Sequence, residues 1–94
     1  MAKSILQDSK DKCFLCGSRQ WLEEHHVFGG YGRRDISERN GFKVYLCHYC
    51  HNEPPNGVHY NAERMKLLRK KCQAKYEETH TREEFMAIIG RNYL

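Results

Sequence analysis

Hydrophobic and polar positions alternate over two short stretches in the first half of the chain. Residues 42–46 place three apolar side chains on one face, a period-two pattern that predicts a short strand. The apolar face of this stretch carries Phe42, Val44 and Leu46. Residues 21–28 predict a second strand, which ends at the glycine pair that follows it. Residues 29–34 are too rich in glycine for regular structure and predict a loop.

The last third of the chain changes to a helical period. Apolar residues stand three or four positions apart at Met65, Leu68, Cys72 and Tyr76. This spacing predicts a helix over residues 61–79, with Asn61 as its N-cap. A second helix is predicted over residues 81–89, because its start has the capping-box pattern Thr-x-x-Glu and Gly90 stops the apolar run.

The remaining segments lack a period and predict irregular structure. Residues 1–12 are polar, and we expect them to be loosely held. Pro54-Pro55 and Asn56-Gly57 predict an irregular stretch after the second strand. No repeat, low-complexity tract or long linker divides the chain. We therefore expect one small α+β domain over residues 1–94, with the helices packed over the first half.

Composition places the chain among small domains with a polar surface. Its 94 residues are 39% hydrophobic and 30% charged, and the mean hydropathy is −0.87. No apolar run approaches the ~20 residues of a membrane span, and the start MAKSILQDSK lacks the apolar stretch of a signal peptide. We therefore expect a cytoplasmic protein without a membrane partner. The formal net charge of +4 suits a polyanion without demanding one.

Cysteine spacing predicts a zinc site. Two C-x-x-C pairs are present, Cys13 with Cys16 and Cys47 with Cys50. Two such turns present four thiolates to one tetrahedral ion. A hydrophobic core this small needs added stability, which a bound zinc ion supplies. A redox dithiol would need only one pair, and the odd total of five cysteines argues against a disulfide framework. Four thiolates leave no open position, so this zinc should be structural, and Cys72 is expected in the core.

Four histidines are candidates for a second site. His25 and His26 are adjacent and lie between the cysteine pairs. His51 directly follows the second pair, and His59 comes eight residues later. If the pairs meet at one zinc, these side chains share one neighbourhood. Adjacent residues on a strand point to opposite faces, so His25 and His26 cannot both pack in a core. The other two histidines are expected at the surface: His48 and His80.

The order of these residues resembles that of the HNH endonucleases, also called His-Me finger nucleases. The likeness rests on C-x-x-C, then Glu-His-His-Val at residues 24–27, then Leu-Cys-x-x-Cys-His-Asn at residues 46–52, and it covers residues 13–60. A longer string looks like the small HNH proteins of bacteriophages and prophages, which implies the cytoplasm of a bacterial host. It adds Phe28-Gly29-Gly30, Ser37-Glu38, Val58-His59, Arg82-Glu83-Glu84-Phe85 and Gly90-Arg91-Asn92-Tyr93.

This resemblance implies a ββα-metal fold, two strands and a helix around one divalent ion, here with additional C-terminal helices. It makes His26 the general base that activates a water, and His25 a ligand of the ion. The second ligand would be His51 or Asn52, and His59 would complete the site. Mixed imidazole and amide ligands suit Mg²⁺, Mn²⁺, Ni²⁺ or Zn²⁺.

Three details depart from the family pattern or leave alternatives open. The family often carries an Asn shortly before the second cysteine pair, which braces the loop holding the base, whereas Asn40 lies two residues further upstream than usual. Pro54-Pro55 breaks the helix on which the downstream ligand is normally found, so His59 reaches the ion only if this segment folds back. The carboxylate of Glu23 or Glu24 either orients a histidine or is solvated at the strand edge.

Basic residues mark two surfaces that could meet DNA. Arg33, Arg34 and Arg39 flank the glycine-rich loop, where backbone can approach a phosphate and arginines can neutralise it. One predicted helix is also strongly basic, through Lys66, Arg69, Lys70, Lys71 and Lys75. This helix face is either solvated or in contact with phosphate. No major-groove reading helix is recognisable, so sequence-specific cutting is not implied.

Three functions are compatible with these observations. The first is a metal-dependent HNH endonuclease that hydrolyses DNA phosphodiester bonds, in a phage or prophage setting. The second is a non-catalytic zinc-ribbon module that binds nucleic acid or a protein, and it has no need of His26. The third is an accessory factor of DNA processing that acts only with a packaging or recombination partner. A lone HNH domain has one active site, so a homodimer would be one way to cut both strands.

Overall fold

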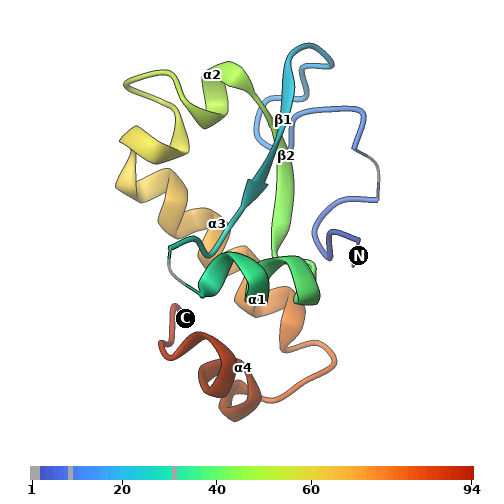
Figure 1. The fold of residues 1–94 in the computed structure, drawn as a ribbon, viewed down its shortest axis with the longest axis vertical. Coiled ribbons are helices and arrows are strands. Elements are labelled where there is room, and N and C mark those ends of the chain that lie inside the picture. The colour runs from blue at the N-terminus through green and yellow to red at the C-terminus, as the bar shows by residue number, and fades with distance from the viewer. Residues whose placement is uncertain (1–2, 9, 31) are drawn as a thin grey trace.

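In the computed structural model, which describes residues 3–8, 10–30 and 32–94, a two-stranded antiparallel sheet lies beside several helices (Figure 1). The expected α+β class is confirmed. The elements of the described residues are β1 (Leu22–His26), α1 (Arg33–Asn40), β2 (Lys43–Cys47), α2 (His48–His51), the 3-10 helix η1 (Val58–Tyr60), α3 (Ala62–Tyr76) and α4 (Arg82–Ile89).

Both predicted strands exist, with shifted limits. In the pairing of β1 with β2, His26 lies opposite Lys43. Strand β1 is shorter than residues 21–28, and Trp21 before it has a left-handed backbone with φ of 54°, which interrupts the extended chain. Strand β2 begins and ends one residue later than residues 42–46. The predicted apolar face is confirmed, because three side chains are fully buried: Phe42, Val44 and Leu46.

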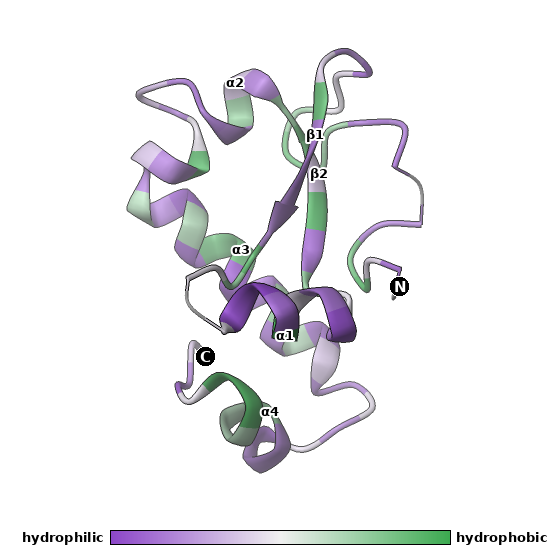
Figure 2. Cartoon of the chain, in the orientation of Figure 1, coloured by the Kyte–Doolittle hydropathy of each residue, from purple (hydrophilic) through white to green (hydrophobic). Residues whose placement is uncertain are grey.

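Helix α1 corrects the expectation of a loop over residues 29–34, of which Tyr31 lies outside the described residues. The helix already begins at Arg33, after Gly32 with φ of 79°, and it ends before Gly41 with φ of 73°. Both flanking positions need a left-handed backbone, which glycine adopts without strain. Figure 2 shows α1 as hydrophilic along its length. A helix without an apolar stripe leaves no period for sequence analysis to detect.

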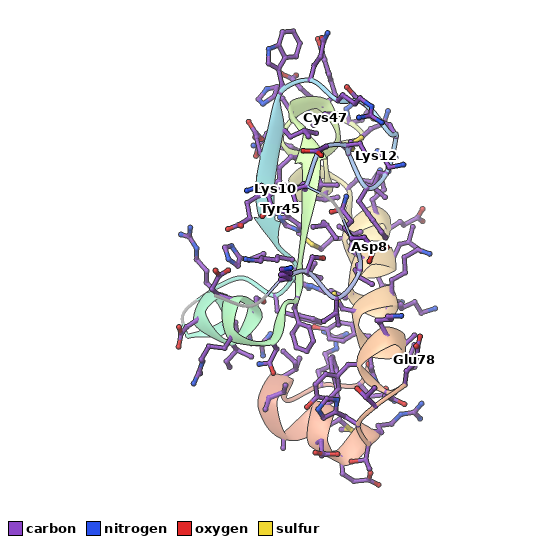
Figure 3. All side chains as sticks on the ribbon, turned by 90° about the vertical axis from the view of Figure 1, so that its right-hand side faces the viewer. Asp8, Lys10, Lys12, Tyr45, Cys47 and Glu78 are labelled. Atoms are coloured by element: carbon purple, nitrogen blue, oxygen red, sulfur yellow. The ribbon has the colours of Figure 1, made fainter. Side chains whose placement is uncertain are left out.

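The N-terminal segment follows the edge of β2, which corrects the expectation of a loosely held stretch over residues 1–12 where the structure describes it. The backbone N–H of Ile5 donates to the Gly41 carbonyl at 3.0 Å. The side-chain oxygen of Gln7 accepts from the backbone N–H of Tyr45 at 2.6 Å. These contacts cover strand-edge groups that would otherwise be unpaired. Figure 3 faces this side and labels Asp8, Lys10 and Lys12 on the segment.

Helices α3 and α4 complete the core, as predicted. Helix α3 ends at Tyr76 rather than near residue 79, and Asn61 caps its start. The expected capping box between Thr81 and Glu84 opens α4, and Gly90 ends it with φ of 86°. The fully buried side chains include Phe28, Phe42, Leu68, Cys72 and Phe85. Within the described ranges, none of the helices is long and apolar enough to cross a membrane.

Candidate metal centres

Four cysteine sulfurs gather where an N-terminal turn meets the end of the sheet. Cys13 and Cys16 come from a tight turn, in which the N–H of Gly17 donates to the Cys13 carbonyl at 2.9 Å. Cys47 ends β2, and Cys50 lies in α2. The four sulfurs lie within 4.8 Å of one another, and those of Cys16 and Cys47 are 3.6 Å apart. Sulfurs at about 2.3 Å from one tetrahedral zinc stand about 3.8 Å apart, so this cluster fits a structural zinc.

The thiols of the four-cysteine cluster differ in how readily they ionise. Burial raises the pKa of Cys13, but hydrogen bonds from the backbone of Cys47 and Cys16 outweigh it and hold this pKa at about 7. Burial and the neighbouring thiols raise the pKa of Cys50. Thiolates this close repel one another, so a divalent cation is needed for all four to ionise together. The fifth cysteine, Cys72, is buried in the core as predicted, and burial raises its pKa.

Three of the predicted ligand residues, His25, His51 and His59, form a second cluster. They come from β1, α2 and η1, and one ring nitrogen of each lies within 4.8 Å of the others. The Nε2 atoms of His51 and His59 are 3.0 Å apart. His25 is 3% exposed, and its buried Nε2 has no hydrogen-bond partner in the described part of the chain. The segment after Pro54-Pro55 therefore folds back far enough to bring His59 into the cluster.

The histidine cluster has the electrostatic character of a cation site. Burial lowers the pKa of His25 to about 3, helped by the charges of His51 and His59, and Arg69 adds an effect of the same sign. Burial, then His51, also lowers the pKa of His59. The rings of His25 and His59 are therefore neutral at pH 7 and offer lone pairs. Nitrogens at about 2.1 Å from one ion stand about 3.0–3.4 Å apart, as those of His51 and His59 do. Coordination would also satisfy the Nε2 of His25, whose burial without a partner costs about 1–3 kcal/mol.

Glu23 on β1 orients one member of the histidine cluster, His51, through a hydrogen bond to the ring nitrogen that faces away from the cluster. Its Oε1 accepts hydrogen bonds from Nδ1 of His51 at 2.7 Å and from the side-chain amide of Asn52 at 3.0 Å. With the proton on Nδ1, the Nε2 lone pair of His51 points into the cluster. A carboxylate that accepts the Nδ1 proton commonly orients a metal-binding histidine in this way. The bond from His51 is the main cause that lowers the pKa of Glu23. Glu23 therefore takes the orienting role that the sequence left open, and Asn52 supports Glu23 rather than joining the ring nitrogens.

His48 extends this network toward the surface. Its side chain is 42% exposed, with Nδ1 at 3.3 Å from Glu23 and Nε2 at 2.9 Å from Glu53. Hydrogen bonds to Glu23 and then Glu53 raise the pKa of His48. Among the contacts of the described residues, Glu23 serves both His48 and His51, whereas Glu53 contacts His48 but not His51.

The expected general base, His26, lies on the opposite face of β1 and is not part of the histidine cluster. Its Nε2 is 2.9 Å from Oε2 of Glu38 and 3.6 Å from Oε1 of Glu24. The buried ammonium of Lys43 lies 3.0 and 3.1 Å from the two oxygens of Glu38 and 3.4 Å from Glu24. The ammonium of Lys43 balances the charge of one of these two carboxylates, so the group around His26 is an ion-pair network. Ligand atoms of Glu24, His26 and Glu38 also lie within 4.8 Å of one another, which makes this group a further candidate for a cation.

Ser37 in α1 braces the chain just after His26. Its hydroxyl donates to the Phe28 carbonyl at 2.7 Å and accepts from the Phe28 N–H at 3.1 Å. Asn40, the residue nearest to the bracing position of the HNH pattern, donates instead to the carbonyl of Ile36 within α1. Sequence analysis gave Ser37 no role of its own, because a fully buried serine in a hydrophilic helix leaves no hydropathy signal.

The three arginines expected to meet DNA are exposed on α1. Arg33 and Arg34 stand in its first turn, directly after the glycine-rich loop. Arg39, in the last turn, pairs with Asp35 at 3.3 Å. Arg34 also lines a surface pocket of 510 Å³ together with His26. Among the lining residues of this pocket, Arg34 is the one of the three arginines that lies with His26.

Comparisons with protein-family models, with curated proteins and with solved structures found no match for this chain.

Proposed function

We propose that this protein is a metal-dependent endonuclease of the HNH type, which hydrolyses DNA phosphodiester bonds. The observation that carries the proposal is the cluster of His25, His51 and His59, in which one ring nitrogen of each lies within 4.8 Å of the others. The buried Nε2 of His25 has no hydrogen-bond partner among the described residues. Three protein ligands leave positions on a divalent ion for substrate oxygens, whereas a structural site is closed. The order β1, β2, α2, with His25 on β1 and His51 on α2, supports a ββα-metal core, and the four cysteines support a structural zinc beside it.

Each residue has a separate role in this proposal. His25, His51 and His59 hold the divalent ion, which when bound supplies positive charge to the phosphate and the leaving oxygen. His26 takes up a proton from the attacking water, because imidazole is the side chain that changes charge near neutral pH. Glu38 holds the His26 ring through the 2.9 Å contact with Nε2, so Nδ1 is the atom left to accept the proton.

His25 and His26 lie on opposite faces of β1, and the edge of this strand away from β2 is where a ligand could approach both. In the described part of the chain, β1 pairs with β2 on one edge and has no strand on the other. A phosphate lying along that free edge would meet His25 from one face and His26 from the other. The edge is therefore where we place the DNA backbone.

A non-catalytic zinc-ribbon module is the second candidate. Such a module would use the four cysteines but has no need of the histidine cluster or of a carboxylate that orients it. The setting in a phage or prophage, a packaging or recombination partner and a homodimer rest on the resemblance to HNH proteins, and they accompany the nuclease proposal.

A plasmid-cleavage assay tests the nuclease. Zinc-loaded protein is incubated with supercoiled DNA and Mg²⁺, Mn²⁺, Ni²⁺ or Zn²⁺, and in parallel with EDTA, with zinc content measured in every sample. The variants are His26→Ala, His51→Ala and the exposed control His80→Ala. We expect nicked or linear DNA from the parent and the control, and none from the two site variants or with EDTA. Equal cutting by His26→Ala would contradict the base assignment, and DNA binding without cutting would favour the binding module.

A further inference from the structure

Arg69 in α3 is a half-buried cation held in one place without a carboxylate. Its Nε donates to the carbonyl of Val27 at 3.2 Å. Its guanidinium carbon lies 5.7 Å from the ring centre of Phe28 and 5.8 Å from that of Tyr93. The ion pairs and hydrogen bonds of the described residues give Arg69 no acidic partner. Four other basic residues do pair with carboxylates: Arg39, Lys43, Lys75 and Arg82.

A second arginine shares the ring that holds Arg69. The guanidinium carbon of the exposed Arg91 lies 5.2 Å from the ring centre of Tyr93. The tail that carries Arg91 is fixed by Gln73 of α3, whose side-chain oxygen accepts from the Tyr93 N–H at 2.7 Å and whose amide donates to Asn92 at 2.8 Å. Two guanidinium groups are thus kept near one aromatic ring, and an anion bound nearby would offset the repulsion between their like charges.

The position of this pair relates it to the candidate site. Val27, which accepts from Arg69, directly follows the adjacent histidines at the end of β1. Since Nε is engaged by a backbone carbonyl, the two terminal nitrogens of Arg69 keep their N–H groups for another acceptor. Paired N–H donors in one plane match the oxygens of a phosphate, and stacking on aromatic rings fixes the plane in advance.

Building on the proposed nuclease function, we propose that Arg69 and Arg91 form a clamp for a phosphate of the DNA backbone that flanks the cleaved bond. Arg69 contacts the phosphate from a fixed position, and Arg91 adds charge at its solvent side. On the sequence alone, the basic face of α3 is either solvated or in contact with phosphate. In this proposal its half-buried Arg69 contacts phosphate, and its exposed lysines remain solvated.

Fluorescence anisotropy with a labelled DNA duplex tests the clamp. Zinc-loaded protein is titrated without added catalytic ion, so that binding is measured without cleavage. Arg69→Gln is compared with Lys70→Gln, the same loss of charge at the neighbouring exposed position of α3. We expect Arg69→Gln to weaken binding about tenfold or more, as for lost hydrogen bonds to a charged group. The salt dependence of log K should fall by about 0.9, the value of one phosphate contact, and Lys70→Gln should change both less.

Two further variants keep the test valid if Arg69→Gln unfolds the protein. Arg69→Met retains the apolar stem over Phe28 and Tyr93, and Arg69→Lys retains the charge without the planar fork. Thermal melting and zinc content are measured for each variant. With equal folding, we expect affinity to follow the order parent, then Lys, then Met. Equal affinity of parent, Lys and Met variants would overturn the clamp.

Neutral phosphates in the DNA locate the contact. A methylphosphonate placed at one backbone position at a time should weaken binding by the parent at one or two positions, and at these it should not weaken Arg69→Met further. Additive losses at every position would overturn the clamp.

The clamp and the nuclease fail separately. If the parent cuts plasmid and Arg69→Met binds and cuts equally well, the clamp is wrong and the nuclease stands. If the parent does not cut plasmid, and Arg69→Met loses the position-dependent DNA contact, the phosphate contact of Arg69 stands and the nuclease proposal is wrong.

Discussion

Replacing Glu23 by Gln separates the orientation of the histidine cluster from its ligands. The carboxylate accepts the Nδ1 proton of His51 at 2.7 Å, a charge-assisted bond that fixes which ring nitrogen faces the cluster. Glutamine keeps the size of the side chain and an oxygen acceptor, but it removes the negative charge. The variant keeps all three histidines of the cluster. Any loss of metal affinity therefore comes from a change in the orientation or the basicity of the His51 ring.

The expected magnitude follows from the exposure of the carboxylate. Losing a carboxylate behind a metal-bound histidine commonly lowers metal affinity 10–100-fold, or about 1.4–2.8 kcal/mol. The side chain of Glu23 is 38% exposed, so solvent screens part of its charge. We therefore expect Glu23→Gln to weaken binding of a divalent ion at the cluster about tenfold, the lower end of the range.

Isothermal titration of zinc-loaded protein with Ni²⁺ or Mn²⁺ measures this affinity. Glu53→Gln is the matched control, because Glu53 is 45% exposed and contacts His48 at 2.9 Å, but makes no contact with His51 among the described residues. We expect the control to bind like the parent, with zinc content unchanged in both variants. If Glu23→Gln binds within twofold of the parent, or if Glu53→Gln loses as much, the assigned role of Glu23 is wrong.

Three further perturbations test other parts of the structure. Ser37→Ala removes both hydrogen bonds to the buried Phe28 backbone and should lower the free energy of unfolding by about 1–3 kcal/mol in urea titrations; an unchanged midpoint would contradict the brace. Cys47→Ser should abolish zinc binding and the cooperative thermal transition; a parent-like melt without zinc would disprove the staple. The Thr81 N–H lowers the pKa of Glu84, so its stabilisation is full above the unfolded pKa of about 4.3 and is lost as pH falls through the lower folded value. The stability difference between parent and Glu84→Gln should therefore shrink below about pH 4, and a constant difference from pH 7 to 3 would refute this origin.

Elements with a strong hydrophobic period or with cap residues were predictable from the sequence. The face of Val44 and Leu46, the start of α3 at Asn61 and the capping box of α4 are all found in the structure. Helix α1 was not, because its stability comes from flanking glycines and from the buried hydroxyl of Ser37, neither of which has a period. The N-terminal segment was missed for a related reason. Its contacts include a backbone hydrogen bond from Ile5 and a side-chain hydrogen bond through Gln7, and neither follows a hydrophobic period.

The candidate site divides in the same way. Ligand types and spacing predicted the four-cysteine cluster and the meeting of His25, His51 and His59, since these follow from bringing two C-x-x-C turns together. The roles of the carboxylates around the histidines depend on the direction of their side chains, which the spacing in the sequence does not specify. Only the structure distinguishes Glu23, which orients His51, from Glu24, which lies near His26 on the other face.

Helix α2 has a consequence for how the protein matures. In its four residues, Cys50 and His51 are neighbours, so one peptide unit belongs to both candidate metal centres. So short a helix has little stability of its own, so without zinc at the cysteines His51 would lose a large part of what holds it beside His25. The two ions would then load in a set order, zinc first. Under the proposed function, a host cell starved of zinc would make this chain without making an active nuclease, so the supply of the structural metal would decide when DNA can be cut.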